Sequence, residues 1–182
     1  MGRTVHEKTG RHRHFQSLWF GYWGGAVLEL GFGLGMSAQF IQEHSPAHHV
    51  IIEMNRAIAE TARRFAYGQS GRVAIFEGTW QDIVPLLASE SFHGILFDTY
   101  GMSEADVFRT FTPFLKQAYR LLAPGGTLTY FSDEAAWFSD EHLAALREAG
   151  FSRINGELVN VAPPTDCLYW RQPTILAPTI EK

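Results

Sequence analysis

The sequence predicts an α/β fold of the doubly wound type, and two observations carry this prediction. Residues 26–30 form a short apolar run with β-branched character, which suits a strand buried on both faces. Glycines then occupy alternate positions of residues 31–35, and apolar residues recur at helical spacing over residues 36–41. Because glycine tolerates positive φ and has no Cβ, the backbone can turn there and approach a ligand closely. The pattern is strand, glycine turn and helix, with a ligand expected at the carboxyl end of the strand.

Short apolar runs and helical patterns continue to alternate along the chain. Further strands are expected at residues 49–52, 73–77, 94–98, 127–131, 154–161 and 167–175. Helices are expected at residues 55–67, 83–87, 103–122 and 139–149. Pro113 falls inside the third helix, so a break or kink is expected near Thr112, and residues 123–126 are expected to form a turn. No helix separates the last two strands, so the final strand should pair antiparallel.

The composition of the chain excludes several classes of function. The chain has 182 residues, 46% of them hydrophobic and 19% charged, which suits a single domain with a substantial core. Its net charge of −4 offers no basic field to nucleic acid or a membrane surface. No apolar run approaches the ~20 residues that span a bilayer. A single cysteine, Cys167, and the absence of an apparent signal peptide favour the cytoplasm. The histidines lack a matching ligand set, so no metal site is expected.

The chain divides into two segments in this interpretation. Residues 1–25 contain an aromatic run, which is either a segment packed on the sheet or a lid over the ligand site. Residues 26–182 form the α/β domain. Nothing in the sequence decides between a monomer and a homodimer.

The glycine turn by itself is also typical of a structural turn or a dinucleotide site. Two acidic residues near it make the pattern more specific. Glu29 precedes Gly31 by two residues, and the glycine spacing is G-x-G-x-G rather than G-x-G-x-x-G. Glu53 ends the next apolar run, about twenty residues past the glycines, where nucleotide-binding α/β proteins place a ribose-binding carboxylate. This form resembles motif I of the S-adenosylmethionine-dependent methyltransferases.

More restricted motifs point to one family. The chain resembles guanidinoacetate N-methyltransferase and its relatives, including the delta-arginine methyltransferases of fungi. The stretches that carry the resemblance are residues 27–33, 51–53, 78–82, 92–100, 120–126, 148–151 and 163–169. Asp98-Thr99-Tyr100 and the Pro-Pro-x-Asp-Cys stretch at residues 163–167 are the most specific of them, whereas the glycine and Pro-Gly-Gly pieces occur across methyltransferases.

The resemblance implies a fold, a cofactor and a set of site residues. The fold is the Rossmann-like class I methyltransferase fold, with a mostly parallel seven-stranded sheet, an antiparallel last strand and helices on both faces. The cofactor is S-adenosyl-L-methionine, and its product is S-adenosyl-L-homocysteine. The residues implied to bind the cofactor are Gly31, Phe32, Gly33, Leu34, Gly35, Met36, Ser37, Glu53, Met54, Asn55, Trp80, Gln81 and Asp98. The residues implied to bind the acceptor are Asp98, Tyr100, Asp133 and Glu134.

Some of these residues also have a purely structural interpretation. Glu53 is otherwise a solvated strand end, and Asp98 is otherwise the cap of a turn. For Trp80, a place in the core and a place at the adenine edge are equally compatible with the sequence.

Asp98 is the candidate catalytic residue, and the chemistry explains why an acid belongs there. The pKa of a guanidinium lies far above neutral pH, so the acceptor arrives protonated and its nitrogens are poor nucleophiles. A carboxylate holds such a cation through paired hydrogen bonds and accepts a proton as the new bond forms. Aromatic side chains such as Tyr100, Phe131 and Trp137 are candidates to exclude water and to face the cations.

The chain departs from the family on the acceptor side. The family's W-E-x-P-Y-M motif, whose Glu is a second acceptor-binding carboxylate, is missing before the glycine strand. Asp133 and Glu134 stand where the family binds the acceptor's carboxylate, so we expect a guanidino compound or arginine residue without a carboxylate near the reacting group. Two alternatives remain: an S-adenosylmethionine-binding protein without turnover, or the partner subunit of another methyltransferase. A nicotinamide-dependent oxidoreductase is disfavoured by the glycine spacing.

Overall fold

The computed structural model describes residues 25–69, 71–99, 104–167 and 170–182. The expected lid at residues 1–25, apart from Gly25, lies outside these ranges, and so do Tyr100 and Ser103. Within them the strands are β1 (Ala26–Leu30), β2 (His48–Glu53), β3 (Val73–Glu77), β4 (Phe92–Phe97), β5 (Leu122–Tyr130), β6 (Arg153–Asn160) and β7 (Thr174–Glu181). The helices are α2 (Met36–Glu43), α3 (Arg56–Tyr67), α4 (Trp80–Ile83), η2 (Val84–Leu86), α5 (Glu104–Leu121) and α6 (Asp140–Glu148).

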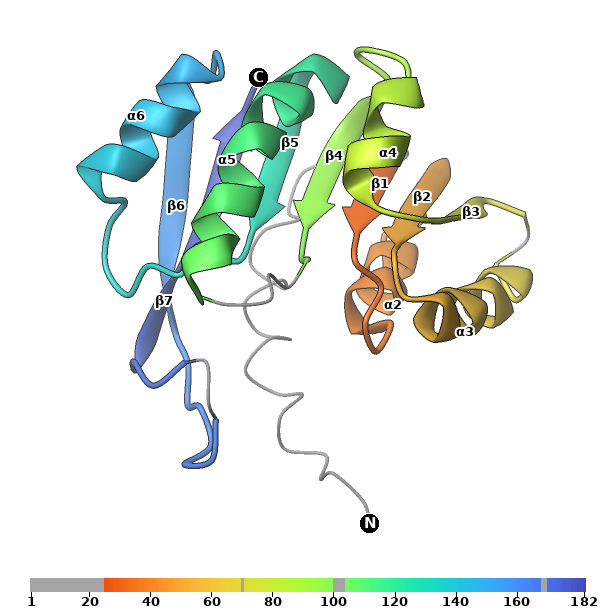
Figure 1. Cartoon of the computed structure of the whole chain (residues 1–182), viewed down its shortest axis with the longest axis horizontal. Coiled ribbons are helices and arrows are strands. Elements are labelled where there is room, and N and C mark those ends of the chain that lie inside the picture. The colour runs from red at the N-terminus through yellow and green to blue at the C-terminus, as the bar shows by residue number, and fades with distance from the viewer. Residues whose placement is uncertain (1–24, 70, 100–103, 168–169) are drawn as a thin grey trace.

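The described strands form one seven-stranded sheet in the order β3-β2-β1-β4-β5-β7-β6. β1 to β5 are parallel, and β7 enters antiparallel to both β5 and β6 (Figure 1). The doubly wound fold, the seven strands and the antiparallel last strand are therefore confirmed. Since the five parallel strands end at the same edge, the loops that follow β1, β2, β4 and β5 meet there.

Alternation along the strands divides the core into two layers. On one face Leu28, Ile95 and Tyr130 pack against α4, η2, α5 and α6, and these helices lie in front of the sheet in Figure 1. On the opposite face Val27 and Ile51 pack against α2 and α3. Both faces of β1 are thus buried, which agrees with its continuous apolar sequence.

Helix α5 differs from the expectation of a break at Pro113. It continues as one helix from Glu104 to Leu121, with Pro113 inside it. Pro113 is exposed, whereas Phe114 and Leu115 beside it are buried in the core. Core packing of this helix face therefore outweighs the local penalty of the proline.

The turn expected at residues 123–126 lies within β5 as a bulge. The ladder to β4 pairs Phe92 with Leu122 and then Gly94 with Thr127, so the residues between them loop out. The backbone of Lys182 closes this bulge, since its carbonyl accepts from the N–H of Gly125 and its N–H donates to the carbonyl of Gly126.

Strand β7 occupies residues 174–181 rather than the expected residues 167–175. The misplacement has a physical reason, because Pro178 disfavours a strand in a sequence pattern. The N–H of Leu176 donates to the carbonyl of Glu134, and the N–H of Lys182 donates to the carbonyl of Gly126 in β5. Alternate residues of a strand direct their N–H groups to the same side, so an N–H at position 178 would also point toward β5. On that side β7 pairs with β5 only at Ile180 and Glu181, so Pro178 removes no hydrogen bond between the two strands.

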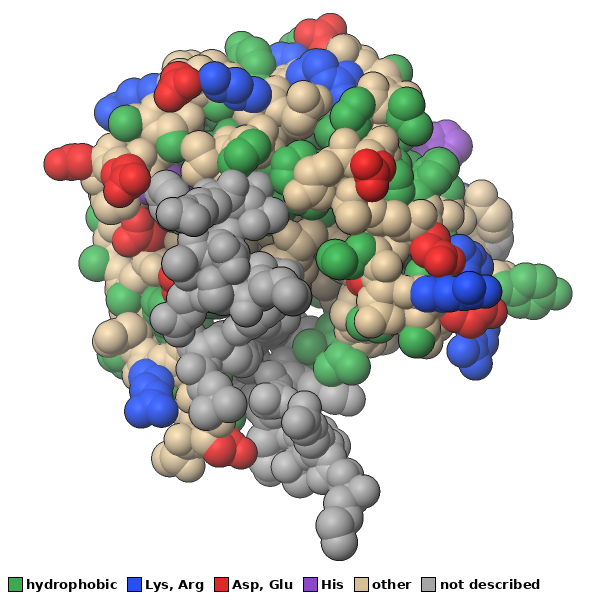
Figure 2. Space-filling view, in the orientation of Figure 1, with side chains coloured by type: hydrophobic (Ala, Val, Ile, Leu, Met, Phe, Trp, Pro, Cys, Tyr) green, Lys and Arg blue, Asp and Glu red, His purple; other side chains and the backbone are tan. Residues whose placement is uncertain are grey.

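Two further features of the described residues bear on the expected partners. None of the helices combines the length and the apolar composition needed to cross a bilayer. On the face seen in Figure 2, acidic and basic side chains are interspersed over the described surface.

Candidate functional site

The glycine turn between β1 and α2 has left-handed backbone at three positions. Gly31, Gly33 and Gly35 have φ values of 90°, 53° and 75°. A Cβ at Gly31 would lie 2.5 Å from the carbonyl oxygen of Asp98, so the turn and the end of β4 are in direct contact. A Cβ at Gly33 would meet nothing within 4 Å, so this glycine faces open space and is needed for its φ. The turn therefore approaches Asp98 on one side and is open on the other.

Glu53, at the end of β2, is held by backbone donors on both of its oxygens. Its Oε2 accepts the N–H of Phe32 at 2.9 Å, and its Oε1 accepts the N–H of Asn55 at 2.7 Å. The residue is 6% exposed. A carboxylate with two charge-assisted hydrogen bonds has a fixed orientation, so it is already positioned for a ligand that donates to its remaining lone pairs.

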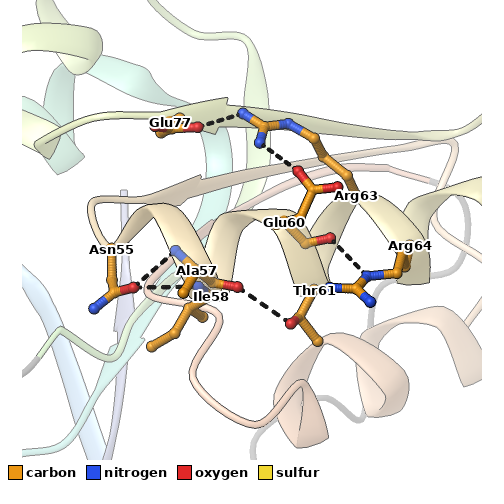
Figure 3. A network of polar contacts seen from close by, with 8 residues as sticks. All are labelled: Asn55, Ala57, Ile58, Glu60, Thr61, Arg63, Arg64 and Glu77. Carbon is orange, nitrogen blue, oxygen red and sulfur yellow. Dashed lines mark hydrogen bonds and ion pairs between the residues drawn. The ribbon is translucent and has the colours of Figure 1, made fainter.

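Asn55 begins the helix that follows. Its Oδ1 accepts the N–H groups of Ala57 and Ile58 at 3.0 and 3.2 Å, which caps α3 (Figure 3). About two turns further on, Arg63 bridges Glu60 and Glu77 at 3.2 and 2.7 Å. Glu77 on β3 is the register partner of Glu53, so Arg63 balances the negative charge of the second acid at this edge of the sheet.

Two large apolar side chains near these groups are exposed. Leu34, in the glycine turn, is 74% exposed, and Met54, directly after Glu53, is 70% exposed. Exposed apolar surface beside an oriented carboxylate is typical of a site that a partly apolar ligand covers. An adenosine moiety matches both features, because it combines ribose hydroxyls with an aromatic base.

Trp80 and Gln81 lie at the start of α4, which begins earlier than expected because Thr79 caps it. The Trp80 ring packs edge-on against Phe97 and Phe114, with centroids 6.3 and 5.3 Å away, so much of this side chain belongs to the core. Its buried Nε1–H has no acceptor among the described residues. Gln81 is exposed.

Asp98 directly follows β4 and is half-buried. Its N–H donates to the carbonyl of Leu30 at 2.9 Å, which ties the end of β4 to the end of β1. Its charge also contributes to the raised pKa of Glu29, so two carboxylates lie close to each other behind the turn. An environment that holds several acids favours cationic ligands.

Glu29 is fully buried, and its partner was not identified from the sequence. Oε2 of Glu29 lies 3.0 Å from Nε2 of His49, an ion-pair distance without the alignment of a hydrogen bond, and Nδ1 of His49 contacts Nε2 of Gln42 at 3.0 Å. Burial raises the pKa of Glu29, while His49 and Ser37 oppose the rise. The sheet register brings the two together, because His49 pairs with Val27, whose side chain points to the same face of β1 as that of Glu29.

The acceptor side begins where β5 ends. Asp133 has left-handed backbone with φ of 57°, which is uncommon for a residue other than glycine. The carboxylate of Glu134 turns toward α6, where its Oε1 accepts the N–H of Ser139 at 3.0 Å. Phe131 packs against Trp170 with centroids 5.8 Å apart, and Trp137 is 53% exposed. The two acids expected to act together therefore differ in role, since Glu134 is engaged with the helix.

The sheet order, the antiparallel β7 and the glycine turn define the fold of the class I S-adenosylmethionine-dependent methyltransferases. The solved structure of Burkholderia thailandensis 1,6-didemethyltoxoflavin-N1-methyltransferase, with bound 1,6-didemethyltoxoflavin and S-adenosylhomocysteine, aligns with a TM-score of 0.70 at 18% identity, over 97% of this chain and 79% of that chain. An S-adenosylmethionine dependent methyltransferase from Mesorhizobium loti aligns with a TM-score of 0.63 at 15% identity, over 93% and 96% of the two chains.

The sequence profile of the family described as guanidinoacetate N-methyltransferase matches residues 1–182, so the chain belongs to this family. Among curated proteins, protein arginine N-methyltransferase 2 of Aspergillus oryzae is 39% identical over 112 residues, covering 60% of this chain and 26% of that protein. The protein of the same name from Yarrowia lipolytica is 31% identical over 111 residues, covering 60% and 22%. The chain therefore spans about a quarter of the length of the curated relatives that it matches.

Proposed function

We propose that the chain is an S-adenosylmethionine-dependent N-methyltransferase that acts on a guanidino group. One observation carries the proposal: the oriented Glu53 carboxylate and the left-handed glycine turn lie beside Asp98, at one edge of the sheet. Family membership supports the reaction class, and the arginine methyltransferase names of the relatives support the guanidino acceptor.

The residues at this edge fit the cofactor. Glu53 would accept the ribose hydroxyls, and the backbone of residues 31–37 would surround the methionine part. Leu34 and Met54 would lose exposed apolar area against the adenosine, with Asn55, Trp80 and Gln81 nearby. When bound, S-adenosylmethionine supplies an electrophilic methyl group on a positively charged sulfur.

Asp98 would act on the acceptor. Its carboxylate holds the guanidinium through charge-assisted hydrogen bonds and fixes the reacting nitrogen. As the N–C bond forms and the C–S bond breaks, one N–H proton passes to Asp98 and later to water, so the methylated guanidinium keeps a single positive charge. Alignment of the reactants supplies up to ~7–11 kcal/mol of the acceleration. Phe131, which is half-buried and packs against Trp170, would help to exclude water at the end of β5.

The acceptor would be a guanidino compound without a carboxylate near the reacting group, such as an arginine residue or an arginine-derived metabolite. Because Glu134 is directed toward α6, Asp133 alone would repel a carboxylate on the acceptor. Asp133 is exposed, so this repulsion would be closer to the about 1 kcal/mol of like charges 4 Å apart in water than to the about 4 kcal/mol at an effective dielectric constant of 20. We further propose that the protein acts in the cytoplasm, as a monomer or homodimer, in view of its single cysteine.

The test is a methyl-transfer assay with labelled S-adenosylmethionine and a panel that contains guanidinoacetate, arginine and arginine-containing peptides. We expect transfer to an arginine-type acceptor in preference to guanidinoacetate. Asp98→Asn should lower kcat by a factor on the order of 10²–10⁴ and leave the affinity for S-adenosylhomocysteine near that of the wild type.

Three results would contradict the proposal. Tight binding of NAD in place of S-adenosylhomocysteine would overturn the cofactor. Near-normal turnover of Asp98→Asn would remove Asp98 from the mechanism. A wild-type preference for guanidinoacetate would overturn the acceptor class while leaving the reaction in place.

A further inference from the structure

A buried polar pair lies in the aromatic core behind the acceptor side. Tyr130, the last residue of β5, has its hydroxyl 2.6 Å from Nε2 of His142 on α6, and both residues are 1% exposed. Phe111 packs on Tyr130 with centroids 4.1 Å apart, and Phe138 packs on His142 at 5.1 Å. Burying polar groups among aromatic rings is unfavourable unless they bond to one another, so this pairing is a specific feature of the core.

The pair fixes the tautomer of His142. Burial raises the pKa of Tyr130 well above its ordinary value, with the charge of Glu134 as a further cause, so the phenol keeps its proton. Because Nδ1, the other ring nitrogen, faces the Glu134 carboxylate, which only accepts hydrogen bonds, the phenol is the donor to Nε2. Burial also lowers the pKa of His142, although Glu134 opposes this shift. A neutral ring that accepts at Nε2 carries its hydrogen on Nδ1. That atom lies 3.5 Å from Oε1 of Glu134, an ion-pair distance without the alignment of a hydrogen bond.

Glu134 belongs to a loop, residues 132–134, that is held on two sides. Toward β7, the Ser132 hydroxyl donates to the carbonyl of Leu176 at 2.6 Å, and the carbonyl of Glu134 accepts the N–H of Leu176 at 2.8 Å. Toward α6, the Glu134 carboxylate accepts the N–H of Ser139. Asp133 lies between these anchors with its left-handed backbone, a conformation that persists only where the surroundings enforce it.

This loop borders the same sheet edge as Asp98. In the ladder between β4 and β5, Phe97 pairs with Tyr130, so the residues that follow these two, Asp98 and Phe131, leave the sheet at the same level. Asp133 comes two residues later. The anchors of the loop therefore influence the geometry of the site on the side away from the cofactor turn.

We propose that His142 is a positioning residue for the acceptor: by connecting Tyr130 to Glu134, it holds residues 132–134 in the conformation that receives the acceptor. This inference rests on the proposed function. The described groups that face the imidazole are Tyr130 from β5, Glu134 from the loop, Phe111 from α5 and Phe138 from the segment before α6. Tyr130 and Glu134 are the titratable ones among them.

The test compares two substitutions of His142. His142→Phe fills the space but connects nothing, whereas His142→Gln offers a carbonyl oxygen to Tyr130 and an N–H to Glu134. We expect His142→Phe to raise the KM for the acceptor by about tenfold, with the affinity for S-adenosylhomocysteine changed less than about twofold, and His142→Gln to recover most of the loss.

A matched control separates positioning from general stability. Arg120 on α5 donates to the carbonyls of Val84 and Leu87, at 2.9 and 2.8 Å, so Arg120→Ala destabilises the same core from a position outside the loop. It should lower the melting temperature without raising the acceptor KM. If Arg120→Ala raises the KM as much as His142→Phe does, or if His142→Phe leaves the KM unchanged, the positioning role is wrong.

Two measurements need no acceptor, so they remain decisive if no guanidino compound is methylated. Nitrogen-15 NMR of the histidine rings should show His142 with its hydrogen on Nδ1. Hydrogen exchange should show the Leu176 amide exchanging faster in His142→Phe than in the wild type, because its acceptor, the Glu134 carbonyl, is released. The opposite tautomer, or unchanged exchange at Leu176, would refute the connection itself.

Discussion

At the scale of single residues, Glu53 illustrates how one side chain serves the fold and the site. Its two oxygens hold the N–H groups of Phe32 and Asn55, which set the start of the glycine turn and the start of α3. The same carboxylate is the proposed acceptor for the ribose hydroxyls. Cofactor affinity and local structure should therefore respond together when the charge is removed.

Replacing Glu53 with alanine should weaken binding of S-adenosylhomocysteine by about 1.5–3 kcal/mol, the range for hydrogen bonds that involve a charged group. It should also lower the melting temperature, because the Phe32 N–H loses its acceptor. Calorimetric titration and thermal unfolding measure the two effects. Glu77→Ala is the matched control, since Glu77 ends the neighbouring strand in register but contacts Arg63. Equal binding by wild type and Glu53→Ala would remove Glu53 from the cofactor site.

At the scale of elements, α5 shows a local preference overruled by packing. Pro113 lacks the N–H that would bond to the carbonyl four residues earlier, yet the helix continues to Leu121 because Phe114, Leu115 and Ala118 are buried against the sheet. An exposed proline inside a helix lowers the stability of that helix, because it removes one backbone hydrogen bond.

Substituting Pro113 with alanine should therefore stabilise the protein by about 1–3 kcal/mol, since it restores a helical hydrogen bond and removes the ring from an exposed position. Chemical denaturation of wild type and variant measures the change. Gln39→Ala, at an exposed position of α2, is the control for helix propensity and should change stability by less. A lower stability of Pro113→Ala would mean that the ring shapes the helix in a way that the core requires.

At the scale of the whole molecule, the buried acid between β1 and β2 should shape the pH dependence of unfolding. Burial raises the pKa of Glu29 above its ordinary value of 4.5, so the folded chain binds this proton more tightly than the unfolded chain. The contribution of Glu29 to stability is fully present below pH 4.5 and decreases as the pH rises through its folded pKa.

Glutamine at position 29 has the same shape but does not titrate. Relative to Glu29→Gln, the wild type should lose stability as the pH is raised from 4.5 toward 8, and melting temperatures across this range measure the difference. Glu157→Gln, at an exposed position of β6, is the control, and its melting temperature should change with pH as that of the wild type does. If the melting temperature of the wild type instead rises relative to that of Glu29→Gln as the pH rises, the attraction between Glu29 and His49 exceeds the cost of burying the Glu29 charge.

How far the sequence predicted this molecule depends on how local each feature is. The first strand, the glycine turn and the helix that starts near Asn55 follow from neighbouring residues, and the structure confirms them. The position of β7 and the bulge at residues 123–126 depend on which backbone groups meet across the sheet, and no short pattern contains that information. Pro178 was misleading because its effect depends on the direction of its missing N–H.

The same distinction applies to the site. The positions of Glu53 and Asp98 at this edge could be predicted, because residues at the carboxyl ends of parallel strands meet at one edge of a doubly wound sheet, whereas their roles remain proposals. The direction of the Glu134 side chain toward α6 could not be predicted, because it depends on how α6 packs against β5, where His142 contacts Tyr130. Partners across the core leave no spacing signal in the chain, and the same holds for His49 beneath Glu29.

The contact of Gly31 with the carbonyl of Asp98 has a consequence for the order in which two ligands act. There is no space at this joint, so a shift of the turn is transmitted to Asp98 without an intervening side chain. Coupling between sites is reciprocal: a factor by which one ligand changes the affinity for a second is returned by the second to the first. If S-adenosylmethionine occupies the turn and the acceptor engages Asp98, as proposed, any change that one of them makes in the affinity for the other is therefore mutual.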